Sequence, residues 1–72
     1  MLANSHTARL IKLYRVARGW RQLDLANALG VSRVRISQVE RGGYVSPAVL
    51  LRFADALKSD DLRKIAIERG AQ

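Results

Sequence analysis

The chain has 72 residues, no cysteine and one histidine, and 13 lysines and arginines against six aspartates and glutamates give it a net charge of +7. This length fits one small domain over residues 1–72. Disulfides and thiolate zinc sites are excluded, and His6 alone cannot build a metal site. Residues 1–41 carry eight cations and two acids, and residues 42–72 carry five and four, so the excess lies in the first part. Such a basic domain is typical of a protein that contacts a polyanion, although a basic protein without a nucleic-acid role is the alternative.

The chain lacks the signals of a membrane or exported protein. No apolar run approaches the roughly 18 residues that a membrane span needs. The first ten residues do not contain the apolar core of a signal peptide. We therefore expect a cytoplasmic, nucleoid-associated protein without a membrane partner.

The first helix is expected over about residues 8–18, with Thr7 as its N-cap and Gly19 just after its end. Its apolar residues recur at helical spacing and predict one inward stripe. That stripe consists of Leu10, Leu13, Tyr14 and Ala17.

The next two helices are separated by a very short connection. One is expected over residues 22–29 and ends at Gly30, and the other begins after the N-cap Ser32 and runs to about Arg41. Only "GVS" joins them, and a short glycine-containing turn between two short helices indicates a helix-turn-helix at about residues 22–41. By itself this signal is weak, because other helical hairpins use similar turns.

Two further helices complete an all-α domain of five helices without strands. Ser46 caps the fourth helix, with Pro47 at its first position, and Ser59 caps the fifth, followed by acids that suit a helix N-terminus. The fifth helix closes at Arg69 and Gly70, and we expect residues 1–6 and 70–72 to be disordered. The apolar face of the fourth helix is expected to hold Leu50, Leu51, Phe53, Ala54 and Leu57.

The third helix has two unlike faces when its residues are placed about 100° apart. Ile36 and Val39 point toward the core. The opposite side contains no acid and offers arginine for guanine, glutamine for adenine and valine for the thymine methyl group, which favours DNA recognition over a merely solvated face. The outward residues are Arg33, Val34, Ser37, Gln38 and Arg41.

Glu40 lies at the margin between these two faces. An acid in the last turn of a helix is unfavourable to the helix dipole, so a partner is expected in preference to free solvation. Arg15 on the first helix is the best candidate. Such an ion pair would fix the third helix against the first more than it would add net stability.

These residues resemble a known family. Residues 15–57, with "RGWRQLDLANALGVSRVRISQVERG" followed by "SPAVLLRFADAL", look like the Cro/repressor, lambda-repressor-like (XRE-type) helix-turn-helix regulators of phages and bacteria. The pieces "LANALGVS" and "ISQVERG" are specific for this family when they occur together. The resemblance implies a compact bundle of five helices whose second motif helix lies in the DNA major groove.

The resemblance also implies roles for single residues. Gln22 matches a glutamine that grips a phosphate and supports the first recognition residue. Arg41 matches a residue that meets the DNA backbone, and Arg15 and Glu40 match the family's ion pair. The positions that match the base-reading face are Arg33, Val34 and Gln38, with Ser37 near the groove wall.

The chain departs from the family pattern at three places. Arg21 stands where many members have a capping serine or threonine, so a cap is lost and a cation is gained. The loop "GGYVSPA" has no basic residue, so phosphate contacts there would come from backbone N–H groups, Tyr44 or Ser46. Val34 is apolar at a position that is often polar.

The sequence therefore predicts a sequence-specific regulator of double-stranded DNA that dimerises on a pseudo-palindrome. A protein-interaction module of the antitoxin type that also touches DNA is the alternative. An enzyme is not expected, nor is a cofactor, a metal or a small-molecule ligand. The phosphate contacts are assigned to Arg18, Arg21, Gln22, Arg41 and Tyr44. The dimer interface is assigned to Leu57, Leu62, Ile65 and Ala66, which could instead simply close the core.

Overall fold

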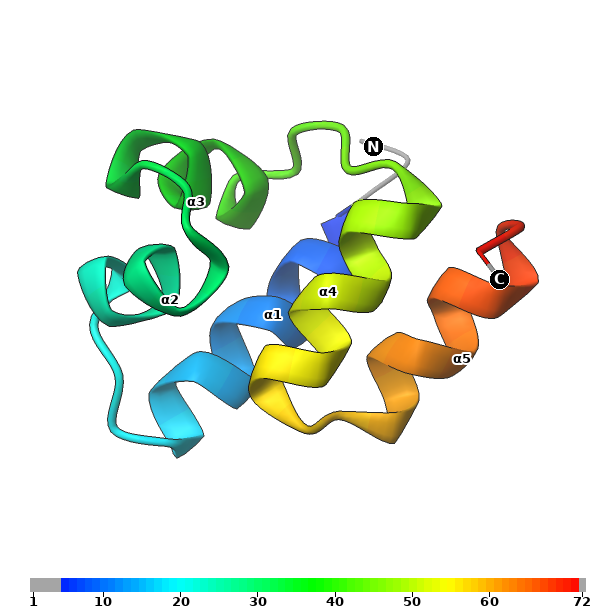
Figure 1. Cartoon of the computed structure of the whole chain (residues 1–72), viewed down its shortest axis with the longest axis horizontal. Coiled ribbons are helices and arrows are strands. Elements are labelled where there is room, and N and C mark those ends of the chain that lie inside the picture. Colours follow the sequence, from blue (N-terminus) through cyan, green and yellow to red (C-terminus); the bar gives the residue numbers. More distant parts are fainter. Residues whose placement is uncertain (1–4, 72) are drawn as a thin grey trace.

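Five helices follow one another in the part of the chain that the computed structural model describes, residues 5–71. Figure 1 shows α2 and α3 together at one end of the molecule and α5 at the other, with α1 and α4 between them. The molecule measures 27 × 25 × 20 Å. The prediction of an all-α domain of five helices is confirmed. The helices are α1 (Ser5–Ala17), α2 (Gln22–Leu29), α3 (Arg33–Glu40), α4 (Pro47–Leu57) and α5 (Asp60–Glu68).

The helix ends follow the sequence closely from α2 onward. Ser32, Ser46 and Ser59 each accept a hydrogen bond from the backbone N–H three residues later, at 3.1, 3.3 and 3.1 Å. Such caps satisfy backbone donors that a helix leaves unpaired at its start. Gly30 ends α2 with φ at +70°, a conformation that favours glycine and turns the chain directly into α3.

The first helix differs from its prediction. It begins at Ser5, so Thr7 lies buried inside the helix and does not cap it. Leu13, expected inside, is 61% exposed, and Ala17 is exposed as well. Leu10 and Tyr14 are only partly buried, and the face that packs inward consists of Thr7, Ala8, Ile11 and Arg15. Two sets of residues recur at helical spacing on α1. The set that packs inward contains Arg15, so a search for apolar residues alone does not select it.

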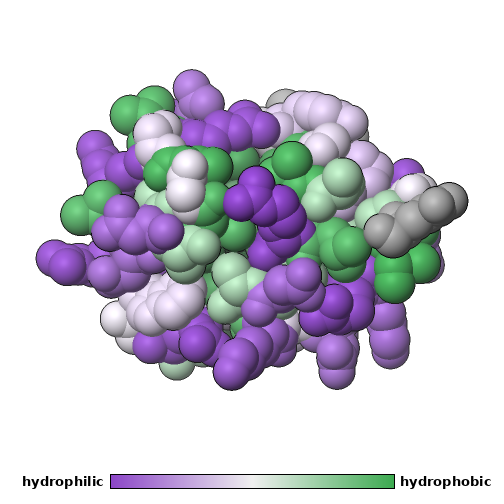
Figure 2. Space-filling model, viewed as in Figure 1, coloured by the Kyte–Doolittle hydropathy of each residue, from purple (hydrophilic) through white to green (hydrophobic). Residues whose placement is uncertain are grey.

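The core lies between α1, α4 and the inner sides of the other helices. It includes Ile11, Leu25, Ile36, Leu50 and Leu62, none of which has measurable exposure. The four buried residues of α4 are Leu50, Phe53, Ala54 and Leu57, as predicted, while Leu51 is half-buried. Figure 2 shows mainly hydrophilic residues along the rim of one face, with apolar residues visible in patches between them.

Two further predictions concern α5 and the two ends of the chain. Leu57, Leu62 and Ala66 are buried within the single chain and Ile65 is partly buried against the same core, so these residues close the core, and their part in a dimer stays a prediction. The expected disorder of residues 1–6 and 70–72 also stays a prediction; within the described residues, Ser5 and His6 belong to α1, and the Ala71 N–H donates to the carbonyl of Ala66 at 2.9 Å. Residues 1–4 and 72 lie outside the described residues.

Candidate nucleic-acid interface

The helices α2 and α3 are anchored to the core through few side chains. Leu25, Ala26 and Leu29 of α2 are buried, whereas only Ile36 and Val39 are buried on α3. The Val31 N–H in the turn donates to the carbonyl of Ala26 at 3.0 Å, which fixes the turn against the end of α2. This arrangement holds α3 by one narrow side and leaves most of its surface outside.

The outer face of α3 carries the residues that the sequence assigned to base reading. Arg33 and Gln38 are exposed, Val34 is 57% exposed and Ser37 is half-buried. Arg41, the C-cap of α3, is also exposed. Ser37 lies about one helical turn beyond Arg33, and Gln38 lies about one turn beyond Val34. These four residues therefore form two adjacent pairs on one face of α3.

Glu40 is the one acid on α3, and it is turned away from that face. Its side chain is 4% exposed and pairs with Arg15, whose side chain is 10% exposed. Nε of Arg15 donates to Oε2 of Glu40 at 2.6 Å and Nη2 donates to Oε1 at 3.1 Å. Nη1 of Arg15 donates to the carbonyl of Trp20 at 2.7 Å, so the guanidinium joins α1, the α1–α2 connection and α3.

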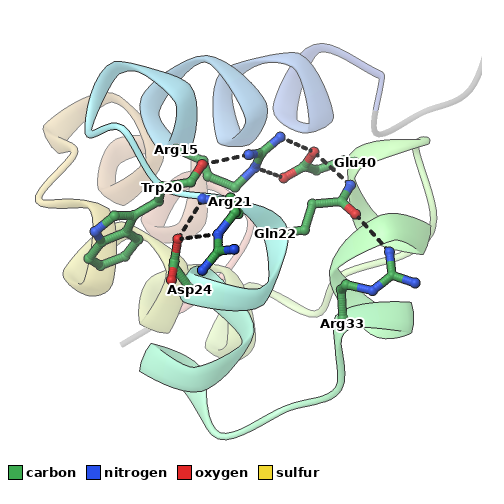
Figure 3. Close-up of polar contacts among 7 residues, drawn as sticks. All are labelled: Arg15, Trp20, Arg21, Gln22, Asp24, Arg33 and Glu40. Carbon is green, nitrogen blue, oxygen red and sulfur yellow. Dashed lines mark hydrogen bonds and ion pairs between the residues drawn. The ribbon is translucent and has the colours of Figure 1, made fainter.

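Gln22 extends this ion pair toward the surface (Figure 3). Its Nε2 donates to Oε1 of Glu40 at 3.2 Å, and its Oε1 accepts from Nη1 of Arg33 at 3.5 Å. Gln22 is half-buried and Arg33 is exposed, so the contacts run from the interior to the outer face of α3.

Arg21 and Asp24 begin α2 in place of an ordinary cap. The Asp24 carboxylate accepts from the backbone N–H of Arg21 at 2.7 Å and lies 3.5 Å from its Nε (Figure 3). That backbone hydrogen bond holds the pKa of Asp24 below its ordinary value of 3.8. The Arg21 side chain is 81% exposed, so its contact with Asp24 is weak and leaves the guanidinium accessible.

Two other residues assigned to phosphates lie in the connections next to α2 and α3, Arg18 after α1 and Tyr44 after α3. The Arg18 guanidinium stacks over the Trp20 ring, 4.6 Å from its centre. Tyr44 is exposed in the loop after α3, and its backbone carbonyl accepts from Nη2 of Arg35 at 3.1 Å. Arg35 therefore ties the loop to α3.

The comparison with family models agrees with this geometry. A model described as helix-turn-helix matches residues 11–64, three quarters of the chain. The chain belongs to this helix-turn-helix family, the lambda-repressor-like class. It is a domain of the DNA-binding regulator type, and the resemblance drawn from its motifs is confirmed. Neither the curated proteins nor the solved structures gave a match.

Three residues of the helix-turn-helix domain have structural roles that the sequence analysis missed. Trp20 provides a carbonyl for Arg15 and a ring for Arg18, Asp24 starts α2, and Arg35 holds the loop after α3. The spacing of Asp24 three residues after Arg21 resembles one half of a capping box and could have identified it. No sequence signal identifies the acceptor of Arg35, because that acceptor is a backbone carbonyl.

Residues 5–71 contain neither a candidate metal site nor a candidate membrane span. No group of three or more histidine, aspartate or glutamate side chains there could hold a metal ion. Within the same range, no helix is both long and apolar enough to cross a membrane.

Proposed function

We propose that the domain regulates transcription by binding double-stranded DNA at a specific sequence, with α3 in the major groove. One observation carries the proposal: the only acid of α3, Glu40, is buried on Arg15, and the remaining outer face is free of negative charge. An acid on that face would repel phosphates, whereas arginine, glutamine and valine are side chains that distinguish bases by their edges. The reading residues are Arg33, Val34, Ser37 and Gln38.

Contacts with the DNA backbone would set the orientation of the domain. Arg21 and Arg41 are exposed at the start of α2 and the end of α3, and Tyr44 is exposed in the loop that follows. Phosphate contacts of this kind position a protein on the duplex without selecting sequence. The proposed set is Arg18, Arg21, Gln22, Arg41 and Tyr44.

We further propose that two copies bind a pseudo-palindromic operator. A single short recognition helix makes few base contacts, and two-fold DNA sites with half-sites about 34–36 Å apart double that number. Of the four residues assigned to the contact between the copies, Leu57, Leu62 and Ala66 are buried in the single chain and Ile65 is partly exposed.

Selection of bound duplexes from a random library tests the proposal directly. We expect one recovered half-site, repeated in inverted orientation at a fixed spacing. Recovery of no sequence preference would leave only non-specific binding, with affinity that falls steeply with salt. A stoichiometric protein partner without any DNA shift would instead favour the antitoxin-like alternative.

Two variants separate reading from positioning. Gln38→Ala should cost about 1–3 kcal/mol on the selected site and relax the preference at one base pair. Arg21→Ala should weaken binding to all duplexes alike and lower the salt slope by about one. Lys64→Ala on α5 removes the same charge far along the chain from this surface and is the control. An unchanged preference in Gln38→Ala would contradict the assigned reading face.

A further inference from the structure

A row of four side chains connects the interior of the domain to the outer face of α3. Arg15 contacts Glu40, Glu40 contacts Gln22, and Gln22 contacts Arg33 (Figure 3). The first pair is almost completely buried, and the last residue is exposed. The buried pair is thus in contact, through one side chain, with the first residue of α3.

The hydrogen bonds in this row have a fixed direction because a carboxylate only accepts. Oε2 of Glu40 accepts from Arg15, and Oε1 accepts from both Arg15 and Gln22. Gln22 must therefore turn its amide nitrogen toward Glu40, since an amide has a donor end and an acceptor end. Its oxygen is then the atom that faces position 33.

This direction determines which side chain suits position 33. An acceptor that points at the position is matched by a donor, and arginine presents five N–H groups and no acceptor. One N–H of Arg33 lies toward Gln22 at 3.5 Å, which leaves the others for O6 and N7 of a guanine.

We propose that Glu40 is a positioning residue for base reading: by fixing the amide of Gln22 with its oxygen toward α3, it holds Arg33 for bidentate recognition of guanine. This role rests on the proposed function. It differs from that of the ion pair itself, because Arg15 makes two hydrogen bonds to Glu40 without Gln22.

Glu40→Gln tests the role while it keeps the size of the side chain. The new amide would keep its oxygen on Nε of Arg15, the shorter contact at 2.6 Å, and would place its nitrogen at the position of Oε1, which now accepts from both Gln22 and Nη2 of Arg15. Gln22 would then turn round and present a donor to Arg33. We expect the preference for guanine at the base pair read by Arg33 to fall by about fivefold or more, with the preference at the Gln38 base pair unchanged.

Gln22→Leu and the double variant separate this role from a purely structural one. Gln22→Leu removes the intermediate contact from a half-buried position and should cause the same loss at the same base pair. Adding Glu40→Gln to Gln22→Leu should then cause no further loss. Asp55→Asn neutralises a carboxylate that is paired with Arg63 at 2.7 Å in a more exposed position on the α4–α5 side; it is the control for the loss of a negative charge and should leave every preference unchanged.

The orientation of Gln22 also has a readout that does not need DNA. In the free wild-type protein, the side-chain amide protons of Gln22 should show slowed exchange by NMR, and Glu40→Gln should shift their resonances and speed that exchange. Because Glu40→Gln leaves the buried Arg15 without its anion, it should destabilise the domain, so circular dichroism and urea titration establish that each variant is folded under the conditions of the binding measurement.

The outcomes distinguish the two proposals. A wild type that prefers a sequence, together with a Glu40→Gln variant that keeps its guanine preference, would overturn the positioning role alone. Equal loss at both base pairs would also overturn it and make Glu40 a residue that only maintains the fold. A wild type without any sequence preference would overturn the proposed function, even if the NMR result places the Gln22 amide as described.

Discussion

The helix pair α2–α3 and the helix pair α4–α5 are held in the molecule by different forces. Four residues of α4 are buried and α5 adds Leu62 and Ala66, so that pair is fixed mainly by apolar contact. The helix α3 buries two residues, and its end is fixed by Glu40 in hydrogen bonds with two other helices. A helix that exposes most of its surface buries few apolar side chains. Directed hydrogen bonds then determine its orientation.

The two pairs are nevertheless joined by one directed contact. Nη2 of Arg52 on α4 donates to the carbonyl of Leu29, in the last residue of α2, at 2.7 Å. A cation at a helix C-terminus also complements the helix dipole. The end of α2, where the chain turns toward α3, is therefore held by a side chain of α4.

The largest effect should come from breaking the buried ion pair between Arg15 and Glu40. Arg15→Met leaves Glu40 buried without its cation, and loss of one partner of a buried ion pair costs about 3–5 kcal/mol of unfolding free energy. Urea titration followed by circular dichroism measures this change. Trp20, whose carbonyl binds Arg15, reports the same region by fluorescence.

The double variant Arg15→Met/Glu40→Leu is the control for that prediction. Replacing a buried ion pair by apolar side chains is often neutral or stabilising, so we expect most of the lost stability to return. A double variant as unstable as the single one would mean that apolar groups cannot fill this place, and that the polar contacts also provide the packing of α3.

An effect of similar or smaller size is expected for a buried leucine of α4. Leu50 has no exposure, and Leu50→Ala should cost about 2–5 kcal/mol because it removes buried methyl groups and leaves a cavity. The matched control is Leu13→Ala, whose side chain is exposed and should change stability by less than about 0.5 kcal/mol. Equal costs at the two leucines, measured by urea titration, would contradict the assigned core.

The smallest effect concerns the start of α2 and depends on pH. The folded state lowers the pKa of Asp24, so its contribution to stability is present above its ordinary pKa of 3.8 and is lost as the pH falls through the lower folded value. Asp24→Asn should therefore reduce the dependence of the unfolding free energy on pH in that acidic range. Its dependence on pH between about 6 and 8 should be the same as in the wild type. Thermal unfolding at a series of pH values measures both. An unchanged acid limb would contradict the role of the Asp24 carboxylate.

The sequence predicted the elements best where a single residue type determines the local structure. The start of α4 follows from Ser46 and Pro47, and the limits of α2 follow from the spacing that ends at Gly30. The pairing of Arg15 with Glu40, inferred from an acid in an unfavourable position, is present in the structure.

The sequence was less informative where a charged side chain is buried. Arg15 is buried through its aliphatic stem and its hydrogen bonds, so a pattern of apolar letters on α1 misses it and selects Leu13 instead. The dimer assignment stays a prediction for a related reason. Apolar residues on α5 were equally compatible with a partner and with the core, and in so small a domain the core needs them.

Gly43 constrains any redesign of this protein for new DNA targets. A Cβ atom at this position would lie 2.8 Å from the backbone oxygen of Gln38, and the Gly43 N–H donates to that same oxygen at 2.9 Å. A side chain there would push the loop away from the turn that presents Gln38. A combinatorial library should therefore randomise positions 33, 34, 37 and 38 and keep glycine at 43, so that new side chains are displayed on an undistorted helix.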